Sequence, residues 1–204
     1  RKLLTEVYDL ERLVGRISYE NANPKDLLQL RKSLENIPKI HKLIKQTGLN
    51  DNFNLETDFE KYKEVYKLID SSICLDAPYT IKEGNVIKKG YSSELDELKS
   101  INLDSKNYIL SLEAREKERT GIKTLKVGYN KVFGYFIEVS KLQSEQIKDE
   151  YGYIRKQTLS NAERYITQEL KDKEALILRA EEKILSLEHK LFTEIRNTLK
   201  NYTY

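Results

Sequence analysis

The sequence has little of what most catalytic or metal sites need: one cysteine, two histidines, no methionine and no tryptophan among 204 residues. The single thiol, Cys74, cannot form a disulfide within the chain or complete a cysteine-based metal site, which fits a reducing compartment. His41 and His189 lie far apart among charged residues, a pattern typical of surface histidines. We therefore expect no catalytic residues and no cofactor or metal in this chain.

Two longer signatures are also missing. No apolar run approaches the ~20 residues of a membrane span, so we expect no membrane contact and a cytoplasmic location. The glycines from Gly84 to Gly90 do not have the spacing of a G-x-x-x-x-G-K-[ST] phosphate loop. Because the chain lacks methionine and begins at Arg1 within a charged helical pattern, we expect an internal piece of a longer protein.

The charge is unevenly distributed. The net charge is +3. Residues 117–165 hold ten Lys or Arg against six Asp or Glu, a net charge of +4, whereas the rest of the chain holds 26 against 27. The same segment contains four of the eight glycines. This shift in composition marks residues 117–165 as a separate basic module.

Apolar residues at three- and four-residue spacing predict helices through most of the chain. Asn23-Pro24 is a helix start, and Pro38 is expected to end or kink the helix that follows. A short β-hairpin is predicted across Glu83-Gly84. The expected helices cover residues 3–18, 24–37, 40–46, 56–71, 92–118 and 168–201.

Residues 120–165 instead alternate with a period of two. Residues 125–129 and 133–139 form a predicted hairpin that turns at Asn130, and residues 153–159 are a third predicted strand. A polar, helix-like connection is expected over residues 141–150. Alternation also places four aromatic residues in the core of the module: Tyr129, Phe133, Tyr135 and Phe136.

The predicted fold is α+β and mostly α: two long antiparallel helices carry a small antiparallel β-rich module between them. A module whose ends are close, placed between two long helices, favours this pairing. The alternative is a long dimerisation coiled coil interrupted by a small domain.

The module contains residues suited to phosphate binding. Arg155 and Lys156 are cations, and Thr158, Ser160 and Asn161 carry short hydroxyl or amide donors, which commonly bind phosphate oxygens. Lys123, Lys126 and Arg164 add charge. Such contacts do not read base sequence and weaken with salt; a merely soluble basic surface is the alternative interpretation. The candidate DNA-backbone residues are Asn130, Lys131, Arg155, Lys156, Thr158, Ser160 and Asn161.

Several long motifs in order resemble the MutS family of DNA mismatch-repair proteins. They are DLERLVGRI at residues 9–17, NANPKDLLQLRKSLENIP at 21–38, EGNVIKKGYSSELDEL at 83–98, ERTGIKTLKVGYNKVFGYFIEV at 118–139 and YIRKQTLSNAERYITQELKDKE at 153–174. The resemblance implies a core or lever domain over residues 1–117 and 167–204, truncated at both ends, and an inserted clamp domain at 118–166.

The same resemblance implies function. In that family, clamps touch the DNA backbone without sequence specificity, and levers connect them to a distant ATPase that binds ATP and Mg. The expected partners are mismatched double-stranded DNA, a second MutS subunit and a MutL-type repair protein, at the bacterial nucleoid. Ser160 takes the place of a lysine found in relatives. A second hypothesis is a helical interaction module that pairs with protein partners and does not bind DNA itself.

Overall fold

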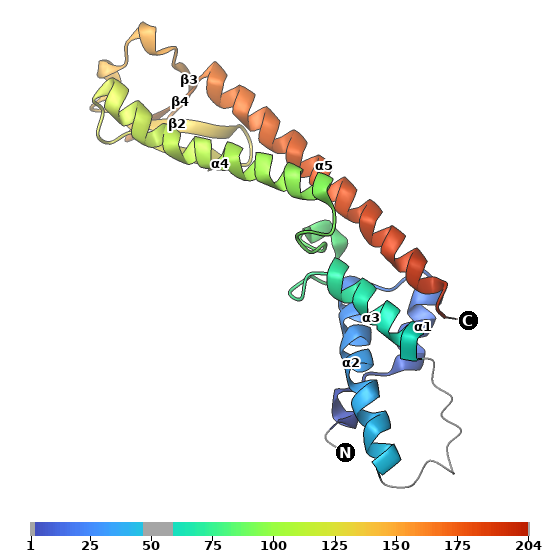
Figure 1. Ribbon diagram of the computed structural model, residues 1–204. Helices are drawn as coiled ribbons and strands as arrows, with labels where there is room; N and C mark the ends of the chain where they lie inside the picture. Colours follow the sequence, from blue (N-terminus) through green and yellow to red (C-terminus); the bar gives the residue numbers. More distant parts are fainter. Residues whose placement is uncertain (1–2, 47–58, 204) are drawn as a thin grey trace. The chain divides into compact units, whose positions relative to one another are not determined.

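The computed structural model describes residues 3–46 and 59–203 and confirms an α+β fold that is mostly helical (Figure 1). The chain divides into two compact units. The first unit comprises Arg1–Asp96 and Ile184–Tyr204, and the second comprises Glu97–Lys183. Helices α4 (Ser93–Thr120) and α5 (Gln168–Lys200) contribute residues to both units. The proposed clamp boundary at residues 118–166 stays a prediction.

The first unit begins with a 3₁₀ helix and a separate α-helix. The predicted continuous helix over residues 3–18 is wrong, because η1 (Leu4–Glu6) ends before the extended residue Val7. Helix α1 (Leu10–Ser18) then starts at Asp9, whose carboxylate accepts a hydrogen bond from the Arg12 amide at 3.0 Å. An aspartate cap satisfies an amide that has no partner inside the helix, so it fixes a new helix start.

Helix α2 (Pro24–Gln46) starts as predicted but does not end at Pro38. Asn23 and Asp26 cap it reciprocally: the Asp26 amide donates to Asn23 Oδ1 at 2.9 Å, and the Asn23 amide donates to Asp26 Oδ2 at 3.0 Å. The expected end at Pro38 is wrong, because proline removes one hydrogen bond and disturbs one turn while the turns on either side remain helical. The alternative, a kink at Pro38, stays a prediction. The predicted helices at 24–37 and 40–46 are therefore one element.

Helix α3 (Phe59–Ser72) covers the described part of the predicted helix at 56–71. The hairpin predicted across Glu83-Gly84 is wrong. Residues 81–83 form a 3₁₀ helix, η3 (Ile81–Glu83), and the β-bridge joins Ile73 to Ile87. The backbone groups of Val86 bond to the residues after α3 and to α5 instead of to a second strand. Val86 O accepts a hydrogen bond from Cys74 N at 2.9 Å, and Val86 N donates to Glu188 Oε2 at 3.4 Å.

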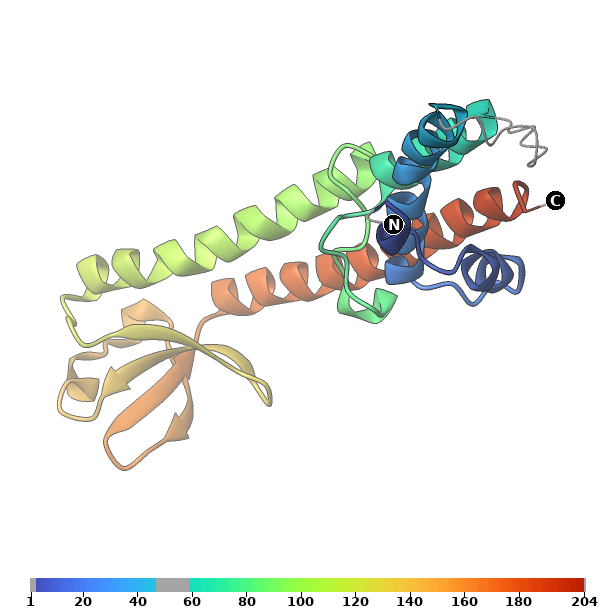
Figure 2. The ribbon, with the colours of Figure 1, turned by 90° about the horizontal axis from the view of Figure 1, so that it is seen from below.

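The second unit pairs α4 and α5 antiparallel, as predicted. Ion pairs join Lys106 to Glu181 and Arg115 to Glu169, both at 2.7 Å. The later residue of α4 thus pairs with the earlier residue of α5, as it must when two helices are antiparallel. Figure 2 shows the sheet beside the end of α4 and the beginning of α5.

The sheet has four antiparallel strands in the order β1-β2-β4-β3. The predicted hairpin and third strand are confirmed, and two 3₁₀ turns fill the connection between them. The sequence interpretation missed β4, which pairs with both β2 and β3. The elements are β1 (Lys126–Asn130), β2 (Gly134–Ser140), η4 (Ser144–Gln146), η5 (Asp149–Tyr151), β3 (Ile154–Thr158) and β4 (Ala162–Ile166).

One face of the sheet packs on both helices. Burial of this apolar surface fixes the sheet on the helix pair, since each buried aliphatic side chain contributes about 1.5–3 kcal/mol. The core consists of Ile109, Leu112, Ile122, Leu125, Ile137, Val139, Tyr165, Leu170 and Ile177.

The aromatic residues only partly follow the predicted core. Tyr135 packs against this core and Phe136 is buried, but Tyr129 is 54% exposed. Phe133 precedes β2, and its ring packs on Phe136 at 5.7 Å between centroids. Gly128 lies directly beneath Phe136, where a side chain would collide with the ring. The expectation that all four aromatics are core residues is therefore wrong for Tyr129.

Candidate nucleic-acid interface

Five of the seven candidate residues lie at two opposite ends of the sheet, and Arg155 and Lys156 lie within β3 between these ends. Strand β2 begins at Gly134, beside the hairpin tip (residues 130–133), and ends at Ser140, which pairs with Ala162 after the β3–β4 turn. Six residues of strand at ~3.3 Å each separate the ends by roughly 20 Å. We call the second end the turn end (residues 123–124, 140–141 and 158–161). The structure therefore does not bring all seven predicted residues together.

Backbone hydrogen bonds close the turn end. Leu159 N donates to Ala162 O at 2.8 Å, and Lys141 N donates to Asn161 O at 3.0 Å. The hydroxyls of Thr124 and Ser140 lie 3.1 Å apart. The backbone thus holds the loop shape, and the side chains of the candidates at this end are exposed: Thr158, Ser160 and Asn161.

Lys156 is presented by an irregularity in β3. Arg155 pairs with Tyr165 and Gln157 pairs with Arg164, so Lys156 is an extra residue between them. A β-bulge leaves its extra residue unpaired and turns its side chain away from the regular pattern. Lys156 is exposed.

The cations of the module differ in whether an acid already neutralises them. Arg164 contacts Glu138 at 2.7 Å and stacks on the Phe136 ring at 4.3 Å, and Arg155 is 3.4 Å from Glu163. Within residues 3–46 and 59–203, no ion pair is formed by the exposed lysines Lys123, Lys131, Lys141 and Lys156. Lys123 and Lys141 lie at the turn end, Lys131 lies at the hairpin tip, and Lys156 lies in the bulge of β3, two residues before Thr158.

The hairpin tip is built differently. Asn130 Oδ1 accepts a hydrogen bond from Val132 N at 2.7 Å, so this side chain shapes the turn. Lys131 is exposed, and Val132 beside it is 89% exposed. Of the two candidates here, Lys131 has its charge available and Asn130 uses its oxygen within the tip.

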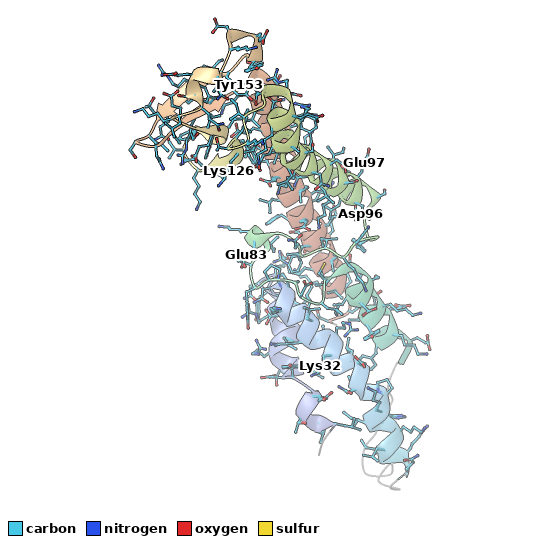
Figure 3. All side chains as sticks on the ribbon, turned by 90° about the vertical axis from the view of Figure 1, so that its left-hand side faces the viewer. Lys32, Glu83, Asp96, Glu97, Lys126 and Tyr153 are labelled. Atoms are coloured by element: carbon cyan, nitrogen blue, oxygen red, sulfur yellow. The ribbon has the colours of Figure 1, made fainter. Side chains whose placement is uncertain are left out.

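Carboxylates of α4 fix the sheet from one side. Glu113 Oε2 accepts from Val127 N at 3.0 Å; the hydrogen bond from Lys117 and then this backbone bond lower the pKa of Glu113. Glu116 is 3% exposed and accepts from the Tyr153 hydroxyl at 2.7 Å. Burial and then this hydrogen bond raise the pKa of Tyr153. Figure 3 shows Tyr153 among the side chains of the module, with Lys126 extending away from it.

Lys141 was missed as a site residue. It lies in the connection predicted to be helix-like, and its place next to Asn161 depends on β4, which pairs Ser140 with Ala162. Recognising AERYI at residues 162–166 as a strand would have indicated that the end of β2 and the β3–β4 turn meet.

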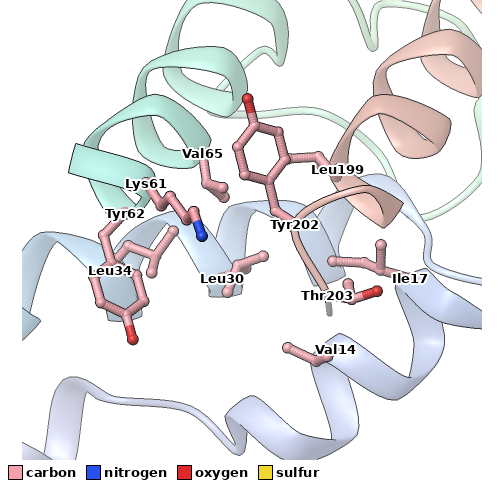
Figure 4. A pocket seen from close by; sticks show the side chains of 10 residues that line it. All are labelled: Val14, Ile17, Leu30, Leu34, Lys61, Tyr62, Val65, Leu199, Tyr202 and Thr203. Atoms are coloured by element: carbon pink, nitrogen blue, oxygen red, sulfur yellow. The ribbon is translucent and has the colours of Figure 1, made fainter. Parts of the chain in front are cut away.

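The first unit holds a cavity of about 250 Å³ between α1, α2, α3 and the C-terminal end of α5, with a mostly aliphatic and aromatic lining (Figure 4). No group of three His, Cys, Asp or Glu residues that could hold a metal ion is found among the described residues. Over the same residues, no helix is long and apolar enough to cross a membrane.

Fold and site together define a class: a small antiparallel module carried between two antiparallel helices. Its exposed lysines form no ion pair among the described residues and lie beside hydroxyl and amide groups. Residues 90–183 match the model of MutS family domain IV. The chain belongs to the MutS family. Its matches include "DNA mismatch repair protein MutS" from Macrococcus caseolyticus (45% identity over 203 residues), Methanosarcina mazei (48% over 207) and Halalkalibacterium halodurans (49% over 203).

The matched region covers nearly all of this chain but only part of each relative. It takes in 99–100% of the chain and 23–24% of those relatives. The chain therefore spans about a quarter of the length of the curated relatives it matches.

Proposed function

We propose that this chain serves DNA mismatch repair by holding the sugar-phosphate backbone of duplex DNA without reading its sequence. The relatives named above are DNA mismatch repair proteins. The observation that carries the proposal is the turn end together with the adjoining bulge of β3, where Lys123, Lys141 and Lys156 are exposed and unpaired in the described chain. Lysines beside hydroxyl and amide donors suit phosphate oxygens, and phosphate contacts position a protein without giving sequence specificity.

Each candidate has a distinct role in this proposal. Lys156 supplies charge, and Thr158, Ser160 and Asn161 supply hydrogen-bond donors next to it. Arg155 contributes less than its charge suggests, because it faces Glu163. Lys131, with Asn130 shaping its turn, forms a second contact at the hairpin tip.

The module also transmits motion in this proposal. Its strands are fixed to α4 through Glu113 and Glu116, and to α5 through Lys171, whose ammonium donates to Phe133 O at 2.9 Å. A sheet bound to both helices must move with them. We therefore propose that α4 and α5 couple DNA contact to an ATPase elsewhere in the whole protein, which would bind ATP and Mg; this chain itself would not be an enzyme.

The partners follow from the same proposal. The whole protein would bind mismatched double-stranded DNA, pair with a second MutS subunit and act with a MutL-type repair protein, in the bacterial cytoplasm at the nucleoid. The lysines described here provide no means of recognising a mismatch, so that task would belong to another region.

Binding to a labelled duplex of ~30 base pairs at low and moderate salt tests the DNA contact. We expect measurable binding at low salt, weaker binding at moderate salt, and a marked loss in a variant with Lys131→Glu and Lys156→Glu. A variant with Lys183→Glu and Lys190→Glu, two exposed lysines on α5, is the charge-matched control. No binding at low salt, or equal losses in the variant and the control, would contradict the proposal.

A helical interaction module remains the second candidate function. It is favoured by exposed apolar side chains on α4: Leu103 is 59% exposed and Leu110 is 74% exposed. Such residues could pair with another chain. Sedimentation over a range of concentrations separates the candidates, because a strictly monomeric chain that binds DNA would exclude self-pairing through these helices.

A further inference from the structure

The hairpin tip is held to the first turns of α5 by a charged pair. Lys171 Nζ donates to the backbone oxygen of Phe133 at 2.9 Å and contacts Glu174 Oε2 at 2.9 Å. The Glu174 residue is 8% exposed. One ammonium group therefore joins the carbonyl of the tip to a buried carboxylate of the helix.

Gly134 makes this close approach possible. Its φ of +82° is in the left-handed region, and the Glu174 carboxylate occupies the space where a side chain at this position would lie. The tip thus rests directly on the carboxylate, and no β-carbon separates the two. Because a partly buried carboxylate needs a counter-charge, Glu174 in turn holds Lys171 in the orientation that reaches Phe133.

We infer that Lys171 and Glu174 are positioning residues, which fix the hairpin tip on α5 and so direct Lys131 toward a DNA phosphate. The inference rests on the proposed function, because it assigns the pair a role in DNA contact. Lys131 is two residues before Phe133, and it is the tip lysine that remains exposed and unpaired in the described chain. Without the pair, the tip would sample many orientations, and the contact made by Lys131 would lose its preorganisation.

Two variants with opposite charge changes test the inference. Glu174→Ala raises the net charge and Lys171→Met lowers it. Electrostatics by itself predicts tighter DNA binding for the first and weaker binding for the second. Loss of positioning predicts that both weaken binding, by about three-fold each at low salt. Glu182→Ala and Lys183→Met, at exposed positions of the same helix, are the matched controls.

A second experiment tests whether the two variants weaken DNA binding through Lys131. In a Lys131→Ala background, Glu174→Ala should no longer weaken DNA binding, because the contact that it positions is already gone. Lys171→Met should then weaken binding only as much as its control Lys183→Met does. Lys171→Arg retains a cationic donor and should bind as the wild type does. Amide exchange at Asn130 and Gly134 should rise about ten-fold in both weakening variants, independently of DNA.

The outcomes separate the inference from the proposed function. Equal loss in both backgrounds, or tighter binding by Glu174→Ala, overturns the positioning role. Unchanged affinity in Lys131→Ala, together with a loss in Lys156→Glu, overturns the inference and leaves DNA contact at the turn end intact. No binding by the wild type overturns both.

Discussion

The two ends of the sheet carry similar residues but hold them in different ways. At the hairpin tip, side chains form the structure: Asn130 accepts from Val132 N, and Lys171 binds Phe133 O. At the turn end, backbone bonds such as Lys141 N to Asn161 O do so. Closing a loop through its backbone leaves the side chains available for a ligand. In the function proposed above, the turn end would therefore be the main DNA contact, and the hairpin tip would depend on α5.

The largest expected effect is on the stability of the hairpin tip. Gly134 and Gly152 both have positive φ, at 82° and 66°, but only Gly134 faces Glu174; nothing lies within 4 Å of the position of a Gly152 side chain. Gly134→Ala should lower the free energy of unfolding by about 3 kcal/mol or more, and Gly152→Ala by about 1 kcal/mol. Urea unfolding followed by circular dichroism measures both. Equal losses would show that the Glu174 contact does not constrain the tip.

The next effect concerns DNA affinity at the turn end. Replacing Lys123, Lys141 and Lys156 together by glutamine should weaken binding by at least ~30-fold at low salt and reduce the slope of log affinity against log salt by about 3. Lys131→Gln should reduce that slope by about 1 or less. Fluorescence anisotropy across a salt series gives both values. If Lys131→Gln changes the slope as much as the triple variant does, the hairpin tip contributes at least as much to DNA binding as the turn end.

A smaller effect tests the buried network behind the turn end. The Tyr165 hydroxyl donates to Glu163, which also faces Arg155. Burial, and then the hydrogen bond with Glu163, raise the pKa of Tyr165 to about 12, above the ~10 of an unfolded tyrosine. The folded state therefore disfavours the ionised phenol, and stability that is fully present below pH 10 is lost as the pH rises toward 12.

Tyr165→Phe removes this ionisation, so its free energy of unfolding should decline less than that of the wild type between pH 10 and pH 12. Urea unfolding at several pH values measures the difference in slope. Tyr129→Phe, a substitution at a residue that is 54% exposed, controls for the lost hydroxyl. The same decline in the wild type and Tyr165→Phe would rule out a contribution from the Tyr165 environment.

The smallest effect compares the two asparagines. Asn130→Ala removes the acceptor for Val132 N and should cost about 1 kcal/mol of stability. Asn161→Ala should change stability by less than about 0.5 kcal/mol and should weaken DNA binding, because its side chain is exposed at the turn end. Thermal unfolding and anisotropy on the same samples separate the two roles. A stability loss in Asn161→Ala as large as in Asn130→Ala would contradict the comparison.

The sequence predicted most elements because their signals are local. The three- and four-residue spacing of apolar residues predicted α4 and α5, and the alternation of apolar and polar residues predicted β1, β2 and β3. Strand β4 was missed because AERYI carries Glu163 and Arg164 in a strand between two others. Their charges are balanced by Arg155 and Glu138 on neighbouring strands, and such partners cannot be read from a five-residue segment. The wrong hairpin at Glu83-Gly84 has the same origin, since the backbone there bonds to α3 and α5.

For the candidate site, too, some properties could be predicted from the sequence and others depended on the tertiary structure. The sequence by itself determined the residue types, the basic excess in residues 117–165 and the resemblance to MutS. Tertiary structure decided which charges remain available: Arg164 is neutralised by Glu138, whereas the bulge leaves Lys156 exposed and unpaired in the described chain. It also placed the hairpin tip and the turn end at opposite ends of the sheet. Strand register and ion pairing join residues far apart in sequence, so their outcome exists only once the chain has folded.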